Sequence, residues 1–147
     1  GNPNAYDFPR PMIHSDNLDM SLSGLKTAVL YTVQKIKDLD QSKKADIAAS
    51  FQKAVTDLLV VKIKKAVEET NRKDVIIAGG VAANKFIRNE FKKLEGSLDI
   101  KVYYPDLKYC GDNAAMIAFV GSMMSANKKG KNPSQVRARW PLDELKQ

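Results

Sequence analysis

Apolar residues recur at intervals of three and four early in the chain, which is the spacing of one helix face. The first such stripe predicts a helix that begins at Ser21 or Ser23, and it consists of Leu25, Ala28, Val29, Val33 and Ile36. We expect one of the two serines to cap this helix with its side-chain oxygen. The polar stretch 38–44 then interrupts the pattern.

A second stripe predicts a longer helix from about Ala45 to Thr70. The side chains expected to face a core are Ile47, Phe51, Val55, Leu58, Leu59 and Val67. The last turns of this helix hold Lys62, Lys64 and Lys65. Cations suit that position, because the C-terminal end of a helix carries the negative end of its dipole.

The hydrophobic period changes after the second helix. A short β-branched run at 74–78 predicts a strand that is buried on both faces. The predicted order from there is strand 74–78, helix 82–94, strand 100–104 and helix 112–126. Strands that alternate with helices indicate an α/β fold, in which crossover helices join parallel strands.

Composition narrows the class of protein. A chain of 147 residues with 44% hydrophobic residues is long enough for one domain with a real core. A single cysteine excludes a disulfide framework and CxxC-type zinc or redox sites, and it favours a reducing compartment. No run of apolar residues is long enough to span a membrane. Because the chain opens with Gly1 rather than Met, we expect it to be a piece of a longer protein.

The positive charge is uneven along the chain. The formal net charge is +7, and more than half of it lies in residues 127–147, where Trp140 stands among the cations. A basic segment with an aromatic residue is compatible with contact to a nucleic-acid backbone. A solvated C-terminus explains the same composition, so both interpretations stay open.

The turn after the first strand is the first candidate site. Gly79 and Gly80 lie between a predicted strand and a helix from about Ala82, where free backbone N–H groups meet the positive end of a helix dipole. Asn84, one turn into that helix, is expected to point back into the same crevice. In open α/β sheets ligands bind beyond the carboxyl ends of the strands. Tight packing of strand against helix explains a glycine pair equally well.

The turn before the last helix is the second candidate. Asp112 is either the N-cap of that helix or a carboxylate ligand for a metal ion. The only histidine, His14, is distant in sequence. Cys110 fits a small buried residue better than a nucleophile, because no second histidine is present to activate it. Earlier in the chain, Ser23 and Lys26 are within reach of a ligand, but a cap and a solvated lysine explain them better.

Four segments in this order resemble motifs of the TsaD/Gcp/YgjD family, and they are Asp7–Pro11, Ser21–Ala28, Gly79–Asn84 and Asp112–Ala118. The chain is similar to the C-terminal half of that family, the tRNA N6-adenosine threonylcarbamoyltransferases, over essentially its whole length. Leu22 stands where the family usually has an aromatic residue.

The resemblance implies an ASKHA fold (actin-like ATPase, sugar kinase, Hsp70), of which this chain is the C-terminal lobe. Residues 1–20 would connect it to an N-terminal lobe, 21–126 would form the lobe, and 127–147 would be a basic tail. The family transfers threonylcarbamoyl from threonylcarbamoyl-adenylate to adenosine 37 of ANN-decoding tRNAs.

The resemblance also assigns site residues and partners. Gly79 and Gly80 would line the site for the adenylate or ATP, Asn84 would hydrogen-bond it, and Asp112 would be one ligand of an iron or zinc ion. No catalytic residue is assigned to this chain. The implied partners are tRNA and TsaB-like and TsaE-like proteins or KEOPS-type subunits, and the implied location is the cytoplasm, with no membrane.

The family's His-x-x-x-His metal motif lies in the other lobe, so we expect this chain alone to be inactive and to bind metal weakly or not at all. Lys26, Lys85 and Arg88 lie near the expected crevice, where each either meets phosphate or is simply solvated. Two alternatives stay open: another ASKHA protein such as a sugar kinase, and a non-enzymatic module that binds RNA or protein.

Overall fold

The computed structural model describes residues 1–127, with side chains as far as residue 123. The predicted basic tail, 127–147, therefore lies outside the described residues except for Asn127. The chain divides into two compact units, Gly1–Asp112 and Asn113–Gln147, and each is considered by itself.

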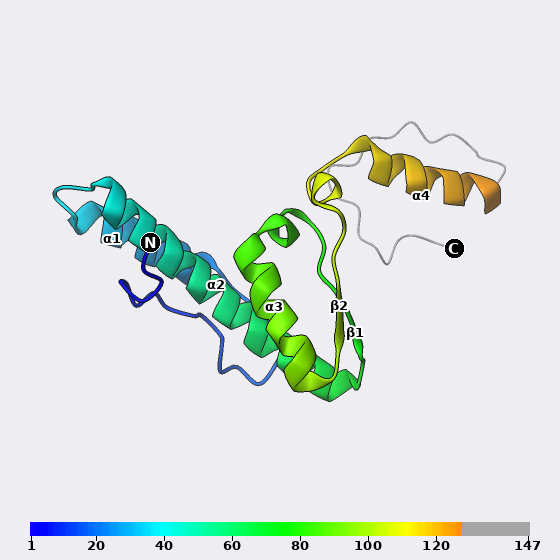
Figure 1. Ribbon diagram of the computed structural model, residues 1–147, viewed down its shortest axis with the longest axis horizontal. Helices are drawn as coiled ribbons and strands as arrows, with labels where there is room; N and C mark the ends of the chain where they lie inside the picture. The colour runs from blue at the N-terminus through cyan, green and yellow to red at the C-terminus, as the bar shows by residue number, and fades with distance from the viewer. Residues whose placement is uncertain (128–147) are drawn as a thin grey trace. The chain divides into compact units, whose positions relative to one another are not determined.

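The order of helices and strands agrees with the prediction (Figure 1). The elements are α1 (Ser23–Lys35), α2 (Gln41–Thr70), β1 (Asp74–Ile76), η1 (Gly80–Ala83), α3 (Lys85–Leu98), β2 (Lys101–Tyr103), η2 (Leu107–Tyr109) and α4 (Ala114–Asn127). The two short 3₁₀ turns, η1 and η2, each follow a strand. The strands are parallel, and α3 is the crossover between them, as an α/β arrangement requires.

Helix α2 is the scaffold of the first unit, because both hydrophobic cores are built on it. Its N-terminal half packs with α1 and the opening segment around Phe8, Leu25, Ile47 and Ala54. Its C-terminal half packs with α3 and the strands around Ile87, Phe91, Leu94, Ile100 and Val102. Figure 1 shows α1 beside one end of α2 and α3 beside the other.

The predicted cap of α1 and the predicted first residue of α2 both differ from the structure. Helix α1 begins at Ser23 as expected, but its N-cap is Leu22 and no side chain caps it. The expected serine cap is wrong, because Ser21 Oγ instead accepts from the Ser23 N–H in a local turn at 3.4 Å. Helix α2 begins four residues early, because Asp40 Oδ1 accepts from the Lys43 N–H at 2.8 Å and so caps it.

The sheet has one covered and one open face. Val75 pairs with Val102 on the face that α3 covers, whereas Ile76 pairs with Tyr103 on the opposite face. Ile76 is 74% exposed and Tyr103 is 41% exposed. The prediction that the first strand is buried on both faces is therefore wrong for the unit Gly1–Asp112, since no second layer of that unit lies on the Ile76 face.

Helix α4 belongs to the second unit. Asn113 Oδ1 accepts from the Met116 N–H at 3.1 Å, so the helix starts two residues later than predicted, with Asn113 as its cap. Its large apolar side chains are exposed, and they are Met116, Ile117, Phe119, Val120 and Met123. A helix that is apolar all round is typical of a buried helix. Among the described helices, none has the length and apolar character needed to cross a membrane.

The opening segment is bound along α2 by polar contacts. The Tyr6 N–H donates to Ser50 Oγ at 3.1 Å, and Arg10 forms an ion pair with Asp57 at 2.9 Å. Lys53 also lies 2.8 Å from the Asp57 carboxylate. Burial alone raises the pKa of Asp57, but the hydrogen bonds and charges of Lys53 and Arg10 outweigh burial and lower it, so the carboxylate stays ionised.

Lys62 is the one lysine of the described chain that is almost completely buried, with 3% exposure. Its ammonium donates to the carbonyl oxygens of Ser15 and Asn17 at 3.1 and 2.7 Å, and to Ser15 Oγ at 2.8 Å. A buried ammonium requires such partners, because leaving water otherwise costs several kcal/mol. Lys62 therefore holds the loop before α1 against α2, a role beyond the dipole effect expected from its position.

We predict that Lys62→Met destabilises the protein by about 2 kcal/mol, because it leaves two carbonyl groups and a hydroxyl without their charged donor. Urea unfolding followed by circular dichroism measures this change. Lys64→Met on the same helix is the control, since the Lys64 side chain makes no hydrogen bond or ion pair within the described residues. Equal losses for the two variants would show that the buried contacts are unimportant.

Candidate functional site

The glycine turn leads from β1 to α3, and its two glycines differ. Gly79 has φ 79° and ψ −177°, a backbone conformation that is essentially restricted to glycine. The Ala82 N–H donates to the Gly79 carbonyl at 3.0 Å and closes the turn η1. Gly80 has no such backbone requirement, and a Cβ built at either glycine meets no atom within 4 Å.

The open space at Gly79 and Gly80 argues against one of the two explanations of the glycine pair. Tight packing of strand against helix is wrong for the described residues, because nothing crowds either glycine. Both glycines are exposed. A turn with bare backbone facing open space is the arrangement that lets a phosphate approach N–H groups.

Asn84 caps α3 rather than standing one turn inside it. Its Oδ1 accepts from the N–H groups of Phe86 and Ile87 at 2.9 and 3.2 Å. Its Nδ2 donates to Gln52 Oε1 of α2 at 2.9 Å. The helix therefore begins at Lys85, not at Ala82, because the four residues before Asn84 form η1. One Nδ2 hydrogen remains for a ligand after these contacts.

Arg88 connects the glycine turn with the loop after β2. Its Nε donates to the Ala82 carbonyl, and its Nη2 donates to the Pro105 carbonyl at 2.8 Å and lies 3.3 Å from Cys110 Sγ. The guanidinium also lies over the Tyr104 ring, 4.9 Å from its centroid. The alternative of a simply solvated Arg88 is wrong, since the side chain is half-buried and holds protein groups.

Tyr104 completes this cluster from the strand side. Its hydroxyl donates to the Arg88 carbonyl at 3.2 Å. Burial, and next the negative charge of Glu95, raise the pKa of Tyr104, and they outweigh the lowering effect of Arg88. The hydroxyl therefore stays protonated and remains a donor.

Asp112 is exposed, and the cap of α4 is Asn113, so the interpretation of Asp112 as an N-cap is wrong. Within residues 1–127 no three His, Cys, Asp or Glu side chains come together in a way that fits a metal ion. This part of the chain therefore holds no metal site of three such ligands. Cys110 is buried as predicted, with 2% exposure.

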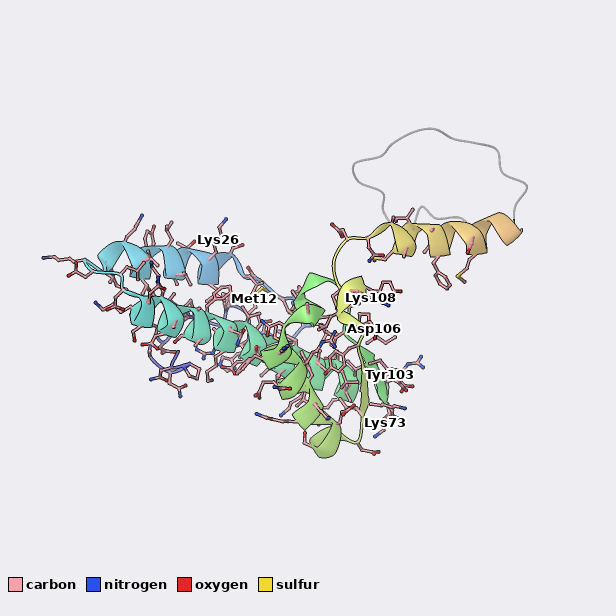
Figure 2. The ribbon with its side chains drawn as sticks, turned by 45° about the horizontal axis from the view of Figure 1, so that its top comes forward. Met12, Lys26, Lys73, Tyr103, Asp106 and Lys108 are labelled. Carbon is pink, nitrogen blue, oxygen red and sulfur yellow. The ribbon has the colours of Figure 1, made fainter. Side chains whose placement is uncertain are left out.

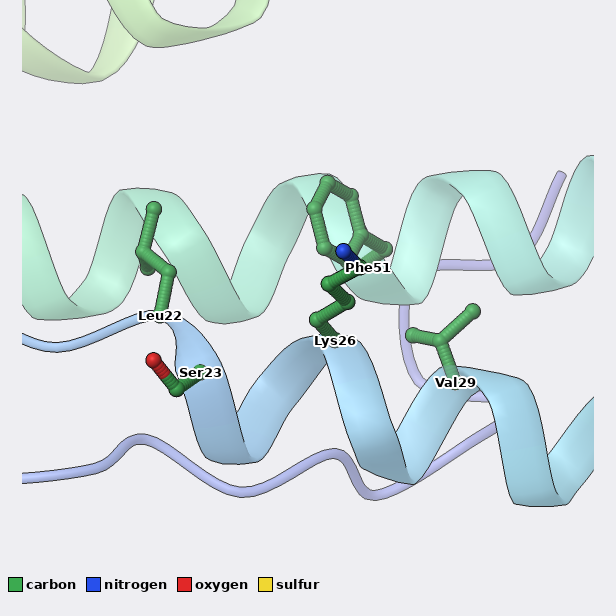
Figure 3. Close-up of a pocket in the computed structure, with 5 residues that line it drawn as sticks. All are labelled: Leu22, Ser23, Lys26, Val29 and Phe51. Atoms are coloured by element: carbon green, nitrogen blue, oxygen red, sulfur yellow. The ribbon is translucent and has the colours of Figure 1, made fainter.

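Ser23 and Lys26 lie away from the glycine turn, on a groove between α1 and α2 of about 450 Å³. Its remaining lining is apolar and consists of Leu22, Val29 and Phe51. Figure 3 shows Lys26 extending from α1 toward Phe51 on α2. Lys85, the first residue of α3, is exposed. Lys108 and Asp106 lie in the segment after β2 (Figure 2).

Sequence reasoning missed Gln52 and Tyr104 and gave Arg88 a different role. Arg88 stands four residues after Asn84, which in sequence is the spacing of neighbouring turns of a helix. That spacing is a signal for a shared role at the start of α3. Gln52 has no comparable signal, because it meets Asn84 only through the packing of α2 against α3.

These features define a class of protein: an α/β unit in which an open glycine turn follows a parallel strand, as in nucleotide-binding folds. Residues 1–119 match the family model for "TsaD: tRNA N6-adenosine threonylcarbamoyltransferase". The chain belongs to this family, which confirms the resemblance seen in its motifs.

Individual relatives agree with the family match. The tRNA N6-adenosine threonylcarbamoyltransferase of Neisseria meningitidis is 43% identical over 163 residues, covering 99% of this chain and 46% of the relative. That of Thermosipho africanus is 53% identical over 121 residues, covering 82% and 36%. That of Herminiimonas arsenicoxydans is 42% identical over 152 residues, covering 100% and 44%. The chain spans less than half the length of these curated relatives.

We predict that Asn84→Ala lowers the free energy of unfolding by about 1 kcal/mol, because the first N–H groups of α3 lose their cap. Asn84→Asp keeps an accepting oxygen at the positive end of the helix and should lose less. Urea unfolding of the three proteins measures the order. An alanine variant as stable as the parent protein would contradict the capping role.

Proposed function

We propose that this chain is the part of a tRNA N6-adenosine threonylcarbamoyltransferase that contributes the glycine turn and Asn84 to the site for the adenylate substrate. The observation that carries the proposal is the open turn at Gly79 and Gly80, found in a chain that belongs to this family. The reaction is proposed from the name that the relatives carry, and the turn is the proposed binding site for the nucleotide.

The turn suits a nucleotide phosphate for physical reasons. It follows the carboxyl end of β1 and precedes α3, whose dipole places partial positive charge at its N-terminus. Gly80 leaves the backbone bare where a side chain would keep a phosphate away. The remaining Nδ2 hydrogen of Asn84 adds one directed donor beside the turn.

The rest of the protein would have to supply most of the metal ligands. The metal ion of the family, iron or zinc, would take Asp112 as one ligand and its other ligands from outside residues 1–127, since this part of the chain holds no suitable group of three. The ion would help to hold the substrate. The chain by itself is therefore proposed to be inactive and to bind metal weakly.

The proposal extends to the ASKHA architecture, of which the α/β unit would form part of the C-terminal lobe. The acceptor would be adenosine 37 of ANN-decoding tRNAs, and the proposed location is the cytoplasm. TsaB-like and TsaE-like proteins, or KEOPS-type subunits, are the proposed partners. Family membership disfavours the sugar-kinase alternative and the non-enzymatic module.

Gly80→Ala in the full-length protein tests the nucleotide site. We predict a change of less than about 0.5 kcal/mol in unfolding free energy, because the added methyl meets no atom of the chain. Affinity for AMP should fall at least about tenfold, because that methyl occupies the approach to the backbone. Calorimetric titration with AMP and urea unfolding measure the two quantities.

The control is Gly96→Ala in α3, where an added Cβ also meets nothing within 4 Å but no ligand is proposed. Modification of tRNA by the full-length protein should stop in Asp112→Ala and continue in the Gly96 variant. Unchanged AMP affinity in Gly80→Ala, or full modification by Asp112→Ala, would contradict the assigned roles.

A further inference from the structure

Arg88 contacts both segments to which site residues are assigned. One guanidinium nitrogen donates to Ala82, at the end of the glycine turn, and another donates to Pro105, in the loop that leads to Asp112. The same side chain therefore bridges two loops that are more than twenty residues apart in sequence.

We propose that Arg88 is a positioning residue that makes the glycine turn and the loop 105–110 move as one body, so that a nucleotide bound at the turn also orders that loop. The part of this inference that concerns the bound nucleotide rests on the proposed function. The bridge itself is a property of the described residues.

The contacts favour this role over binding of phosphate. Nε and Nη2 are both engaged with protein oxygens, and Nη2 also meets the sulfur of Cys110 at 3.3 Å. The Tyr104 ring covers the guanidinium, and the Tyr104 hydroxyl binds the Arg88 carbonyl. A side chain held at this many points has to break several contacts before it can reach an anion.

The chemistry of the side chain explains why arginine stands here. A planar guanidinium presents its donors as a rigid fork, which can hold two carbonyl groups in different directions at once, and its flat face stacks on an aromatic ring. A lysine has one compact ammonium, so it can satisfy one carbonyl well but not the whole arrangement.

Backbone hydrogen bonds within the two bridged segments allow the stability of each segment to be measured by hydrogen exchange. In the glycine turn, the Ala82 and Asn84 N–H groups donate to Gly79 and Val81 at 3.0 Å. In the loop after β2, the Tyr109 and Cys110 N–H groups donate to Asp106 and Leu107 at 2.9 and 3.2 Å. Opening of either turn exposes these amides to hydrogen exchange.

Hydrogen exchange in the full-length protein, with and without AMP, tests the proposal on Arg88→Met and Arg88→Lys. Without AMP, the methionine variant should exchange at least about tenfold faster at the amides of both turns, because a charged hydrogen bond is lost at each. The lysine variant should lie between it and the parent protein. Arg72→Met is the control, since Arg72 is exposed and should change neither turn.

The decisive measurement is whether AMP bound at the glycine turn also slows amide exchange in the loop 105–110. In the parent protein, AMP should slow exchange at Tyr109 and Cys110 as well as at Ala82 and Asn84. In Arg88→Met it should slow exchange only at Ala82 and Asn84, an effect that a general loss of stability does not produce.

Faster exchange in only one turn, or AMP protection of the loop that persists in Arg88→Met, would overturn the proposal. If AMP protects neither turn of the parent protein, the proposed nucleotide site fails. The exchange without AMP then decides by itself whether Arg88 joins the two turns.

Discussion

The arrangement around the guanidinium of Arg88 is the constraint on which the candidate site depends. Two backbone carbonyls, a thiol and an aromatic ring surround one charged group, and they come from the glycine turn, the end of β2 and the loop beyond it. A half-buried cation without these partners would be costly, so the loops are held where they satisfy it. Asn84 fixes the same turn from the other side, because it caps α3 and reaches Gln52 on α2. The open backbone at Gly79 and Gly80 is thus supported by rigid neighbours.

Helix α2 connects the segment around Arg88 with the rest of the first unit. Its C-terminal half holds α3 and the strands, while its N-terminal half holds α1 and the opening segment. Polar contacts at Lys62, Asp57 and Ser50 bind the opening segment along its length. A segment that composition describes only as a connector is therefore part of the packed unit. The covered face of the sheet belongs to this core, and the open face at Ile76 and Tyr103 does not.

Periodicity predicted the order of helices and strands and the parallel pairing, because those depend on local pattern and short connections. It failed where long-range contacts decide. Lys62 looks like a surface lysine in sequence, and only the approach of Ser15 and Asn17 buries it. Asn84 was placed inside a helix because a 3₁₀ turn has no distinct apolar pattern. The strand 74–78 was expected to be buried on both faces from its β-branched composition, yet the unit Gly1–Asp112 covers one face only. The motifs predicted the family. The contacts of Arg88 could not be predicted, because its partners Pro105 and Cys110 come from a segment that is distant in sequence.

We propose that the glycine turn is a nucleotide-binding surface in a threonylcarbamoyltransferase, to which this chain also contributes Asn84 and Asp112. Amide-resolved NMR of the full-length protein during titration with AMP tests it most directly, because each backbone N–H of the turn reports separately. We expect the largest shifts at Gly79, Gly80 and Val81, with little change at the α1–α2 groove near Lys26. Saturable shifts that leave these three amides unchanged would contradict it.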